Sequence, residues 1–172
     1  MTLEFEAGLT QRHKSLRECL VARIYAAGLS NVADDLAKAP KRTTHWDGVR
    51  NYQARNMLRD EIAKGDGVLL YHSSCEVPGV VGIAKVTRAG YPDHTQFDPE
   101  HDHYDPASTR ESPRWYMVDV TLERRFSREI PLETLRAHAT KELDGLLLLR
   151  TGNRLSVMPV EERHWKFIVS LA

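Results

Sequence analysis

The feature that most constrains the fold is a set of short strand-type segments that do not alternate regularly with helices. Residues 115–122 show the alternation of a half-buried, antiparallel strand, with one face formed by Tyr116, Val118, Val120 and Leu122. Apolar runs at 68–71 and 80–86 predict two further strands. Because no βαβ repeat links these segments, the sequence predicts an α+β fold, with a small mixed or antiparallel barrel and peripheral helices.

Length and charge limit the classes of function. The chain has 172 residues, which suits one domain or one domain with an appendage. It carries 24 Lys plus Arg against 24 Asp plus Glu, so its formal net charge is zero. This balance argues against a protein that coats nucleic acid through bulk charge, but it permits a local basic patch around a pocket.

Cysteines and apolar runs indicate the compartment. Cys19 and Cys75 lie far apart in the sequence and form no C-x-x-C pair, which fits a reducing environment. No apolar run approaches the roughly 18 residues needed to span a bilayer, and the first residues include acids and lack the apolar region of a signal peptide. We therefore expect a cytoplasmic protein with no membrane partner.

Helical spacing recurs in two places. Leu16, Leu20 and Ile24 predict one amphipathic helix near the N-terminus. A second helix is predicted from Asn51, as its N-cap, to the Gly65–Gly67 turn, because its apolar residues share one face.

The segment Trp46–Asn56 packs an aromatic residue, two arginines and several amides into eleven residues at the start of that second helix. A helix N-terminus favours anions such as phosphate, and Arg50 and Arg55 could add bidentate contacts. The alternative is that Trp46 belongs to the core, Asn51 only caps the helix, and the arginines form a solvated face. Composition alone favours this alternative.

Tyr71, His72, Ser73 and Ser74 follow a buried strand, at the place where binding groups collect on a rigid frame. Their hydroxyl, imidazole and phenol groups could pair with the edge of a base. A Cys–His nucleophile that uses Cys75 is the sharper alternative, but the sequence offers no third group to orient the pair. A buried, inert Cys75 is favoured over a catalytic one.

A polar loop between Gly90 and Pro113 contains His94, His101 and His103 among prolines and aspartates. A His-x-His pair on a strand can chelate a metal. The surrounding prolines and acids argue against a strand, so a solvated loop is favoured over a metal site. We expect no metal and no cofactor.

Six segments stand out along the chain: WDGVRNYQARN (46–56), YHSS (71–74), PGVVGIAKV (78–86), the YPD…FDP…YDP loop (91–106), RWYMVDV (114–120) and RLSVMPV (154–160). Together, and in this order, they resemble the EVE domain family. The match runs from about Asp34 to the C-terminus. The resemblance implies an EVE domain over 34–172, folded as a PUA-like mixed β-pseudobarrel with peripheral helices and related to the YTH domain.

The resemblance also implies a function. Such domains bind nucleic acid, and the family implies a non-enzymatic, monomeric protein of bacterial type that reads a modified base in DNA or RNA through an aromatic-lined pocket. Carried onto this chain, the base-binding residues are Trp46, Asn51, Arg55, Asn56, Tyr71, His72, Ser73, Ser74, Arg154 and Ser156. Arg50 and Arg55 are the expected phosphate contacts.

Residues 1–33 depart from the family pattern. The family opens with a strand of the type Trp-Leu-Met-Lys-Ser-Glu-Pro, which contributes a serine and a lysine to the pocket, whereas residues 22–28 read as helical. Either this is a divergent segment in the strand's place, or a reading-frame error lies upstream of about Val32. The abrupt change in the match favours the second. As written, the chain would leave a barrel edge open.

Two other functions are carried as alternatives. One is an enzyme acting on a nucleotide-like small molecule, with His72 as acid or base and Cys75 or Ser73 as nucleophile. The other is a non-binding scaffold whose pocket is incomplete because the first strand is missing.

Overall fold

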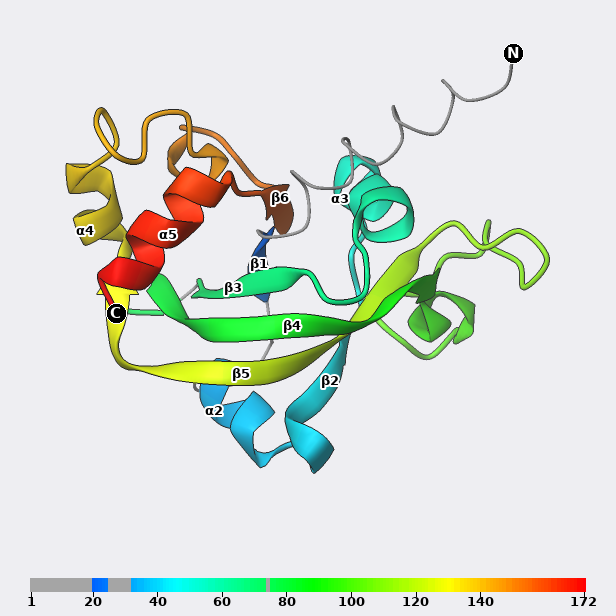
Figure 1. The fold of residues 1–172 in the computed structure, drawn as a ribbon. Coiled ribbons are helices and arrows are strands. Elements are labelled where there is room, and N and C mark those ends of the chain that lie inside the picture. Colours follow the sequence, from blue (N-terminus) through cyan, green and yellow to red (C-terminus); the bar gives the residue numbers. More distant parts are fainter. Residues whose placement is uncertain (1–19, 25–31, 74) are drawn as a thin grey trace, which may run out of the picture.

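The computed structural model describes residues 20–24, 32–73 and 75–172. They form one six-stranded sheet in the order β2-β5-β4-β3-β1-β6 (Figure 1). The β1–β3 pair is parallel and the other neighbouring pairs are antiparallel. The strands are β1 (Leu20–Ile24), β2 (Thr43–Trp46), β3 (Gly67–His72), β4 (Gly79–Pro92), β5 (Tyr116–Pro131) and β6 (Val157–Pro159). The predicted α+β class is confirmed.

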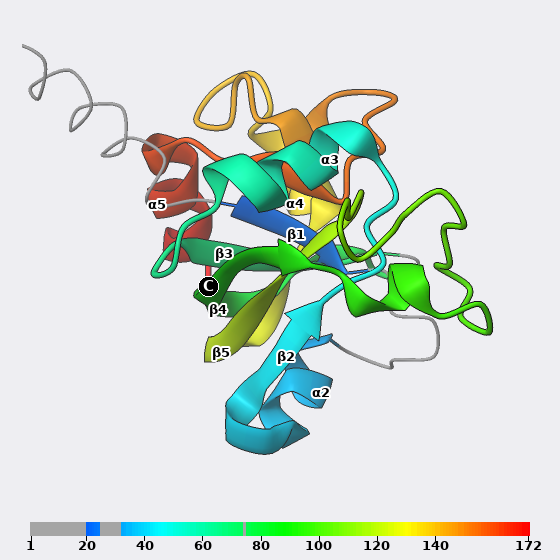
Figure 2. The same cartoon turned by 90° about the vertical axis from the view of Figure 1, so that its right-hand side faces the viewer.

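Short helices surround this sheet. They are α2 (Val32–Lys38), α3 (Tyr52–Asn56), α4 (Leu132–Ala137), α5 (Glu162–Ser170), the π-helix η2 (Met57–Glu61) and the 3-10 helices η1 (Pro40–Arg42), η3 (His94–Phe97) and η4 (Leu147–Leu149). Figures 1 and 2 show α4 and α5 on one side of the sheet and α2 on the other. Within the described residues, no helix has the length and apolar character to cross a membrane.

Strand β1 corrects the sequence prediction for Leu20 and Ile24, which we expected in a helix. It lies between β3 and β6, with Ile24 paired to His72 and Ala22 to Val157. Backbone pairing on both sides outweighs the local helical spacing, and the segment carries strand-favouring β-branched residues. The expected open barrel edge is therefore filled. Residues 1–19 and 25–31 lie outside the described residues, and the boundary at 33/34 stays a prediction.

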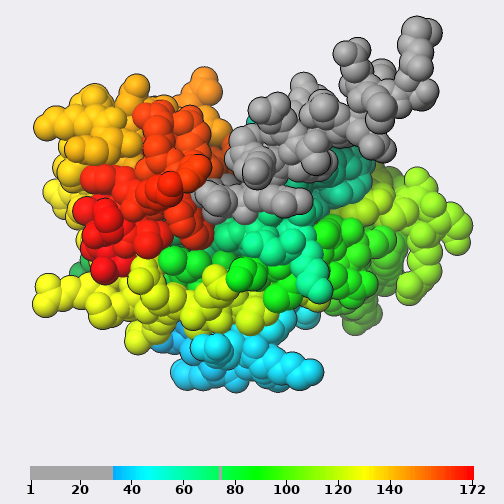
Figure 3. Space-filling view, in the orientation of Figure 1, coloured from blue at the N-terminus to red at the C-terminus, as the bar shows by residue number. Residues whose placement is uncertain are grey.

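The sheet separates two apolar clusters, because side chains alternate across it. The inner cluster includes α2 and residues from β2 to β6, among them Leu36, Trp46, Leu58, Leu70, Val86, Val118 and Val157. The outer cluster lies under α4, η4 and α5 and includes Leu69, Tyr71, Phe126, Leu135, Leu148, Met158 and Ile168. In the space-filling view, the cyan segment that contains α2, η1 and β2 lies on the opposite side of β5 from α5 (Figure 3).

The segment α3–η2 packs against the sheet. Asn51 caps α3 as predicted, since its Oδ1 accepts a hydrogen bond from the Ala54 N–H at 3.0 Å. The predicted long α-helix instead widens to π geometry over Met57–Glu61, which contacts β4, β5 and β6. Gly90 of β4 passes so close that a Cβ there would clash with the Leu58 carbonyl oxygen.

The spacing of Leu143, Leu146 and Leu147 also predicts a short α-helix, and the structure shows this prediction to be wrong. Turns occupy 138–145 and a 3-10 turn follows at Leu147–Leu149. Gly145 adopts a φ of +85° there, which interrupts a right-handed helix. The leucines are still buried in the outer cluster, so their apolar spacing reports burial and not helix.

Val21→Pro tests whether β1 is a central strand. Proline removes a ladder donor and should lower the free energy of unfolding by about 3 kcal/mol, measured by urea denaturation. Val21→Thr keeps the N–H and the β-branched shape and should cost much less. Equal stability of the proline variant and the wild type would show that Leu20–Ile24 does not pair on both sides.

Candidate nucleic-acid interface

The carboxylate of Asp93 fixes the polar loop to the chain that leaves β2. Asp93 is fully buried. It accepts hydrogen bonds from the Gly48 N–H at 2.9 Å, from Arg50 Nη1 at 2.8 Å and from both the N–H and Oγ1 of Thr95. Burial alone would raise the pKa of Asp93, but these bonds from Arg50, Thr95 and Gly48 outweigh it and lower that pKa below its ordinary value.

Arg50 completes the same anchor. Its Nε donates to the His103 carbonyl oxygen at 2.9 Å, and its Nη2 donates to that oxygen and to Thr95 Oγ1. All three guanidinium nitrogens therefore already donate within the protein, and the side chain is only 22% exposed. Of the two predicted phosphate contacts, Arg50 has a structural role here and Arg55 is the stronger candidate.

Gln96 organises the far end of the loop. Its fully buried amide donates to the carbonyl oxygens of Asp93 and Trp115, and its Oε1 accepts from the backbone N–H groups of Arg114 and Trp115. The Trp115 indole N–H donates to Asp105 Oδ2 at 2.7 Å, and this bond is the main cause that lowers the pKa of Asp105. The loop therefore has a fixed shape despite its polar composition.

An aromatic and cationic surface, here called the Tyr52 patch, lies where α3 meets this loop. Tyr52, 51% exposed, stacks on Trp115 with ring centroids 5.0 Å apart. The guanidinium of Arg55 lies over the Tyr52 ring at 5.0 Å, and that of Arg114 at 5.8 Å with a hydrogen bond to the Tyr52 hydroxyl. Stacked aromatic rings and arginines together suit a nucleic-acid strand.

A second group, here called the strand-end group, forms where β3 ends and β6 begins; its residues are His72, Ser73, Arg154 and Ser156. β3 ends at His72, opposite Ile24, and β6 begins at Val157, opposite Ala22, so the residues before β6 lie at the His72 end. Ser73 and Ser156 are then separated by one strand, on the order of 10 Å. Arg154 is exposed and has no bonded partner among the described residues.

The remaining predicted residues take different positions. Trp46, 6% exposed, packs in the inner cluster, and Tyr71, 2% exposed, packs in the outer one, on the opposite face of the sheet. Asn51 caps α3, and Asn56 accepts a hydrogen bond from Arg55 Nε at 2.8 Å. Ser74 lies outside the described residues.

The Ser73 hydroxyl stands out in this group. Its Oγ is buried and has no hydrogen-bond partner among the residues that the structure describes. A buried hydroxyl without a partner costs about 1–3 kcal/mol, and such groups often mark a place where a ligand completes the bonding.

Sequence reasoning missed Tyr52, Arg114, Trp115 and the two buried polar side chains Asp93 and Gln96. The only available signals were the aromatic residues at the helix start and before β5. The contacts that bring them together are long-range: Arg114 bonds to Tyr52, 62 residues away, and to Gln96, 18 residues away. Local patterns do not encode contacts of that range.

Cys75 gives little support to a nucleophile. Its Sγ–H donates to the Val77 carbonyl oxygen at 3.2 Å. Within the described residues, no imidazole or carboxylate is bonded to this thiol.

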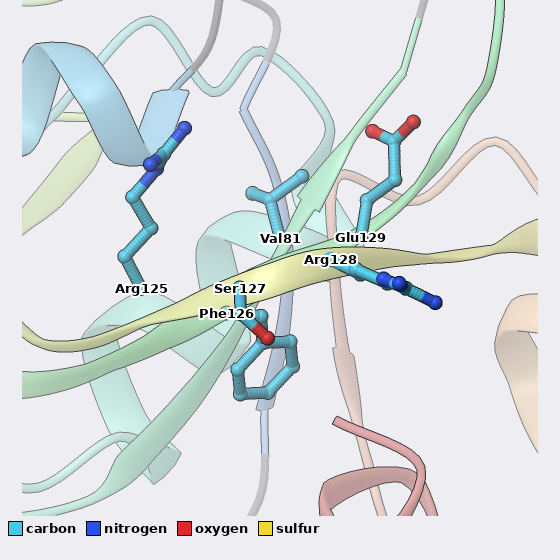
Figure 4. Close-up of a pocket in the computed structure, with 6 residues that line it drawn as sticks. All are labelled: Val81, Arg125, Phe126, Ser127, Arg128 and Glu129. Carbon is cyan, nitrogen blue, oxygen red and sulfur yellow. The ribbon is translucent and has the colours of Figure 1, made fainter.

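A cavity of about 350 Å³ lies elsewhere, along the bend of β5. It is lined by Val81, Arg125, Phe126, Ser127, Arg128 and Glu129 (Figure 4). Arg125 is paired with Asp34 at 2.7 Å, and Figure 4 shows Arg128 pointing away from it. No predicted base-binding residue lines this cavity, and its two arginines do not converge.

Asp93→Asn tests the loop anchor. The folded pKa of Asp93 is lowered from 3.8, so its stabilisation is full above about pH 4 and is lost as the pH falls through the folded value. The variant should lose about 3 kcal/mol of unfolding free energy at pH 7, and its difference from wild type should shrink below pH 3.8. Urea denaturation at several pH values measures both. Exposed Asp102→Asn is the control, and a pH-independent difference would contradict the account.

Comparison with known proteins identifies the family. The EVE domain profile matches residues 30–171. Thymocyte nuclear protein 1 of Homo sapiens is 46% identical over 143 residues, which cover 80% of this chain and 63% of the human protein. The mouse protein is 48% identical over the same coverage. The chain therefore spans less than two thirds of the length of these relatives.

Solved structures of similar proteins share the fold of this chain. A protein from Pseudomonas putida is 42% identical with a TM-score of 0.81, covering 89% of this chain and 98% of that one. Human THYN1 protein in complex with 5-methylcytosine-containing DNA is 38% identical with a TM-score of 0.79, covering 89% of this chain and 95% of that one. The family profile, the relatives and the shared fold lead to one conclusion: this chain belongs to the EVE domain family.

Proposed function

We propose that this chain binds DNA and reads a modified cytosine, such as 5-methylcytosine, without changing it chemically. The observation that carries the proposal is the human THYN1 protein in complex with 5-methylcytosine-containing DNA, which is similar to this chain over 95% of its own length. The Tyr52 patch and the strand-end group give this chain surfaces of suitable chemistry.

Backbone binding would rest on few cations. The formal net charge of the chain is zero, so bulk attraction to DNA is weak. Arg55 and Arg154 are the arginines whose positions suit phosphate contact: one lies on the Tyr52 patch, and the other is exposed before β6. Phosphate contacts hold the register, and a base pocket supplies the selectivity.

Base reading would use the strand-end group. A base edge that reaches Ser73 would give its buried hydroxyl the partner that the described residues do not supply. His72, at the end of β3, adds a ring nitrogen on the neighbouring residue. An unpaired base edge in such a site costs about 1–3 kcal/mol, which rejects bases with the wrong donor and acceptor pattern.

The methyl group itself provides a modest preference. Burying one methyl group contributes about 0.8 kcal/mol, or about a fourfold difference in affinity. A larger preference would need a polar contact that forms only when the methylated base is bound. The base edge and the methyl group therefore make separate contributions to the binding affinity.

The absence of chemistry is part of the proposal. Cys75 bonds to a backbone carbonyl and not to an imidazole, which supports binding over nucleophilic catalysis. A scaffold with an incomplete pocket is less well supported, because β1 occupies the sheet position between β3 and β6.

Ser73→Ala separates reading from folding. The substitution removes an unpaired buried hydroxyl, so the free energy of unfolding should stay equal or rise. Affinity for a duplex with one 5-methylcytosine should fall about fivefold or more, if the base edge bonds this oxygen. Fluorescence anisotropy with a labelled duplex measures the affinity. Unchanged affinity in a stable variant would remove Ser73 from the site.

Arg154→Ala is the companion variant, with exposed Arg136→Ala as its control. Loss of a phosphate contact should weaken the binding of methylated and unmethylated duplexes equally. It should also reduce the slope of log affinity against log salt concentration by about one.

Trp46→Ala is unsuitable as a test of binding, because truncating a tryptophan this buried lowers the free energy of unfolding by about 3–5 kcal/mol.

A further inference from the structure

Three side chains with metal-ligand chemistry meet on the outer surface of β2. The ligand atoms of His45, Asp47 and His94 all lie within 4.8 Å of one another. His45 Nε2 is 3.4 Å from Asp47 Oδ2, and the rings of His45 and His94 meet edge to face with centroids 5.2 Å apart. This His45–Asp47–His94 triad is the one such group among the residues that the structure describes.

The fold explains why the triad forms. His45 and Asp47 flank Trp46 in extended chain, so they point outward while Trp46 points into the inner cluster. Asp93 accepts the Gly48 N–H and Arg50, which places the residue after Asp47 against the residue before His94. The positions of the ligands are thus set by the buried anchor and not by contacts among themselves.

We propose that this triad is a binding site for a divalent transition-metal ion, with Zn²⁺ as the reference ion. Two imidazoles and one carboxylate suit zinc, copper or nickel better than calcium or magnesium. Zinc bonds of about 2.0–2.2 Å put tetrahedral ligand atoms roughly 3.4 Å apart. His45 and His94 are exposed and need only small rotations to reach that spacing. The fourth position is open to water.

Charges around the triad favour a cation. Asp119 lies directly opposite His45 in the β2–β5 pair, and its carboxylate accepts a hydrogen bond from the Tyr91 hydroxyl. Burial, that bond and the charges of Asp119 and Asp47 raise the pKa of Tyr91, so the phenol stays protonated. Arg88, stacked on Tyr91 at 3.6 Å, is the opposing charge. Around Tyr91, the two carboxylates of Asp47 and Asp119 therefore face one guanidinium, that of Arg88.

This triad is not the His-x-His pair, His101 and His103, that the sequence suggested and disfavoured as a metal site. His101 Nδ1 accepts the His103 N–H at 3.1 Å, which occupies one ring nitrogen of that pair. The His103 ring lies under Gly48, where a Cβ would clash with it, and its Nδ1 is buried. His94 instead faces His45, about 49 residues away, a pairing that no local spacing indicates. The proposal therefore replaces the expectation of no metal.

A bound ion would join β2 to η3. It would brace the segment that leads from Trp46 to the cap of α3, and so the approach to the Tyr52 patch. This inference does not depend on DNA binding.

The test uses the full chain without a polyhistidine tag, freed of metal with a chelator. Zn²⁺ binding is measured by competition with a chromophoric zinc indicator, and thermal unfolding is followed with and without Zn²⁺. Wild type should bind one Zn²⁺ per chain and unfold at a higher temperature with the ion. His45→Ala and His94→Ala should each weaken binding at least about tenfold and lose the thermal shift.

Controls make the result decisive. Asp47→Asn keeps the shape and removes the charge, so it should also weaken binding. His101→Ala changes an exposed histidine outside the triad and should bind as wild type does. The variants should unfold like wild type in chelator, because His45 and His94 are exposed. The proposal would be overturned if the wild type showed no saturable Zn²⁺ binding. It would also be overturned if His45→Ala and His94→Ala bound Zn²⁺ as tightly as the wild type.

Discussion

The bond between the buried carboxylate of Asp93 and the guanidinium of Arg50 holds the polar loop against the segment that follows β2. A buried carboxylate is costly unless it is paired and hydrogen-bonded, and Asp93 meets that condition through Arg50, Gly48 and Thr95. The bond joins the exit of β2 to a polar loop of more than twenty residues. Without this bond, the conformational entropy lost on ordering the loop would be offset by little apolar burial.

Two surfaces depend on the bond between Asp93 and Arg50. The Tyr52 patch needs Trp115, which the loop carries through Gln96. The His45–Asp47–His94 triad needs the residues on either side of the anchor to meet. The strand-end group at Ser73 and Arg154 is separate and depends on β1 lying between β3 and β6. The molecule thus presents three surfaces on one sheet, two that depend on the Asp93 anchor and one that depends on β1.

Sequence patterns predicted the fold where local chemistry decides it. The alternation around Val118 and Val120 marked a real strand, because one face is buried, and Asn51 marked a real cap, because it bonds three residues ahead. The patterns failed to predict secondary structure where contacts with distant parts of the chain determine it. Leu20 and Ile24 have helical spacing but pair with β3 and β6, and the helix after Asn56 widens where it meets β4 and β6.

The site was predicted less completely than the fold. Resemblance to the family supplied the residues at the ends of β3 and β6, and the structure brings those two ends together. It did not distinguish a pocket wall from a core residue, which for Trp46 depends on burial by strands far along the chain. Arg50 looked like a free cation because its acceptors on Asp93, Thr95 and His103 lie 43 to 53 residues away along the chain.

We propose, as the main functional conclusion, that this EVE domain distinguishes a methylated cytosine from an unmethylated one in DNA. The most direct measurement compares the dissociation constants of the wild-type chain for two duplexes that differ by a single 5-methyl group, at one fixed salt concentration. The account predicts tighter binding of the methylated duplex by at least about fourfold, the contribution of one buried methyl group. Equal dissociation constants, or no saturable binding of either duplex, would contradict it.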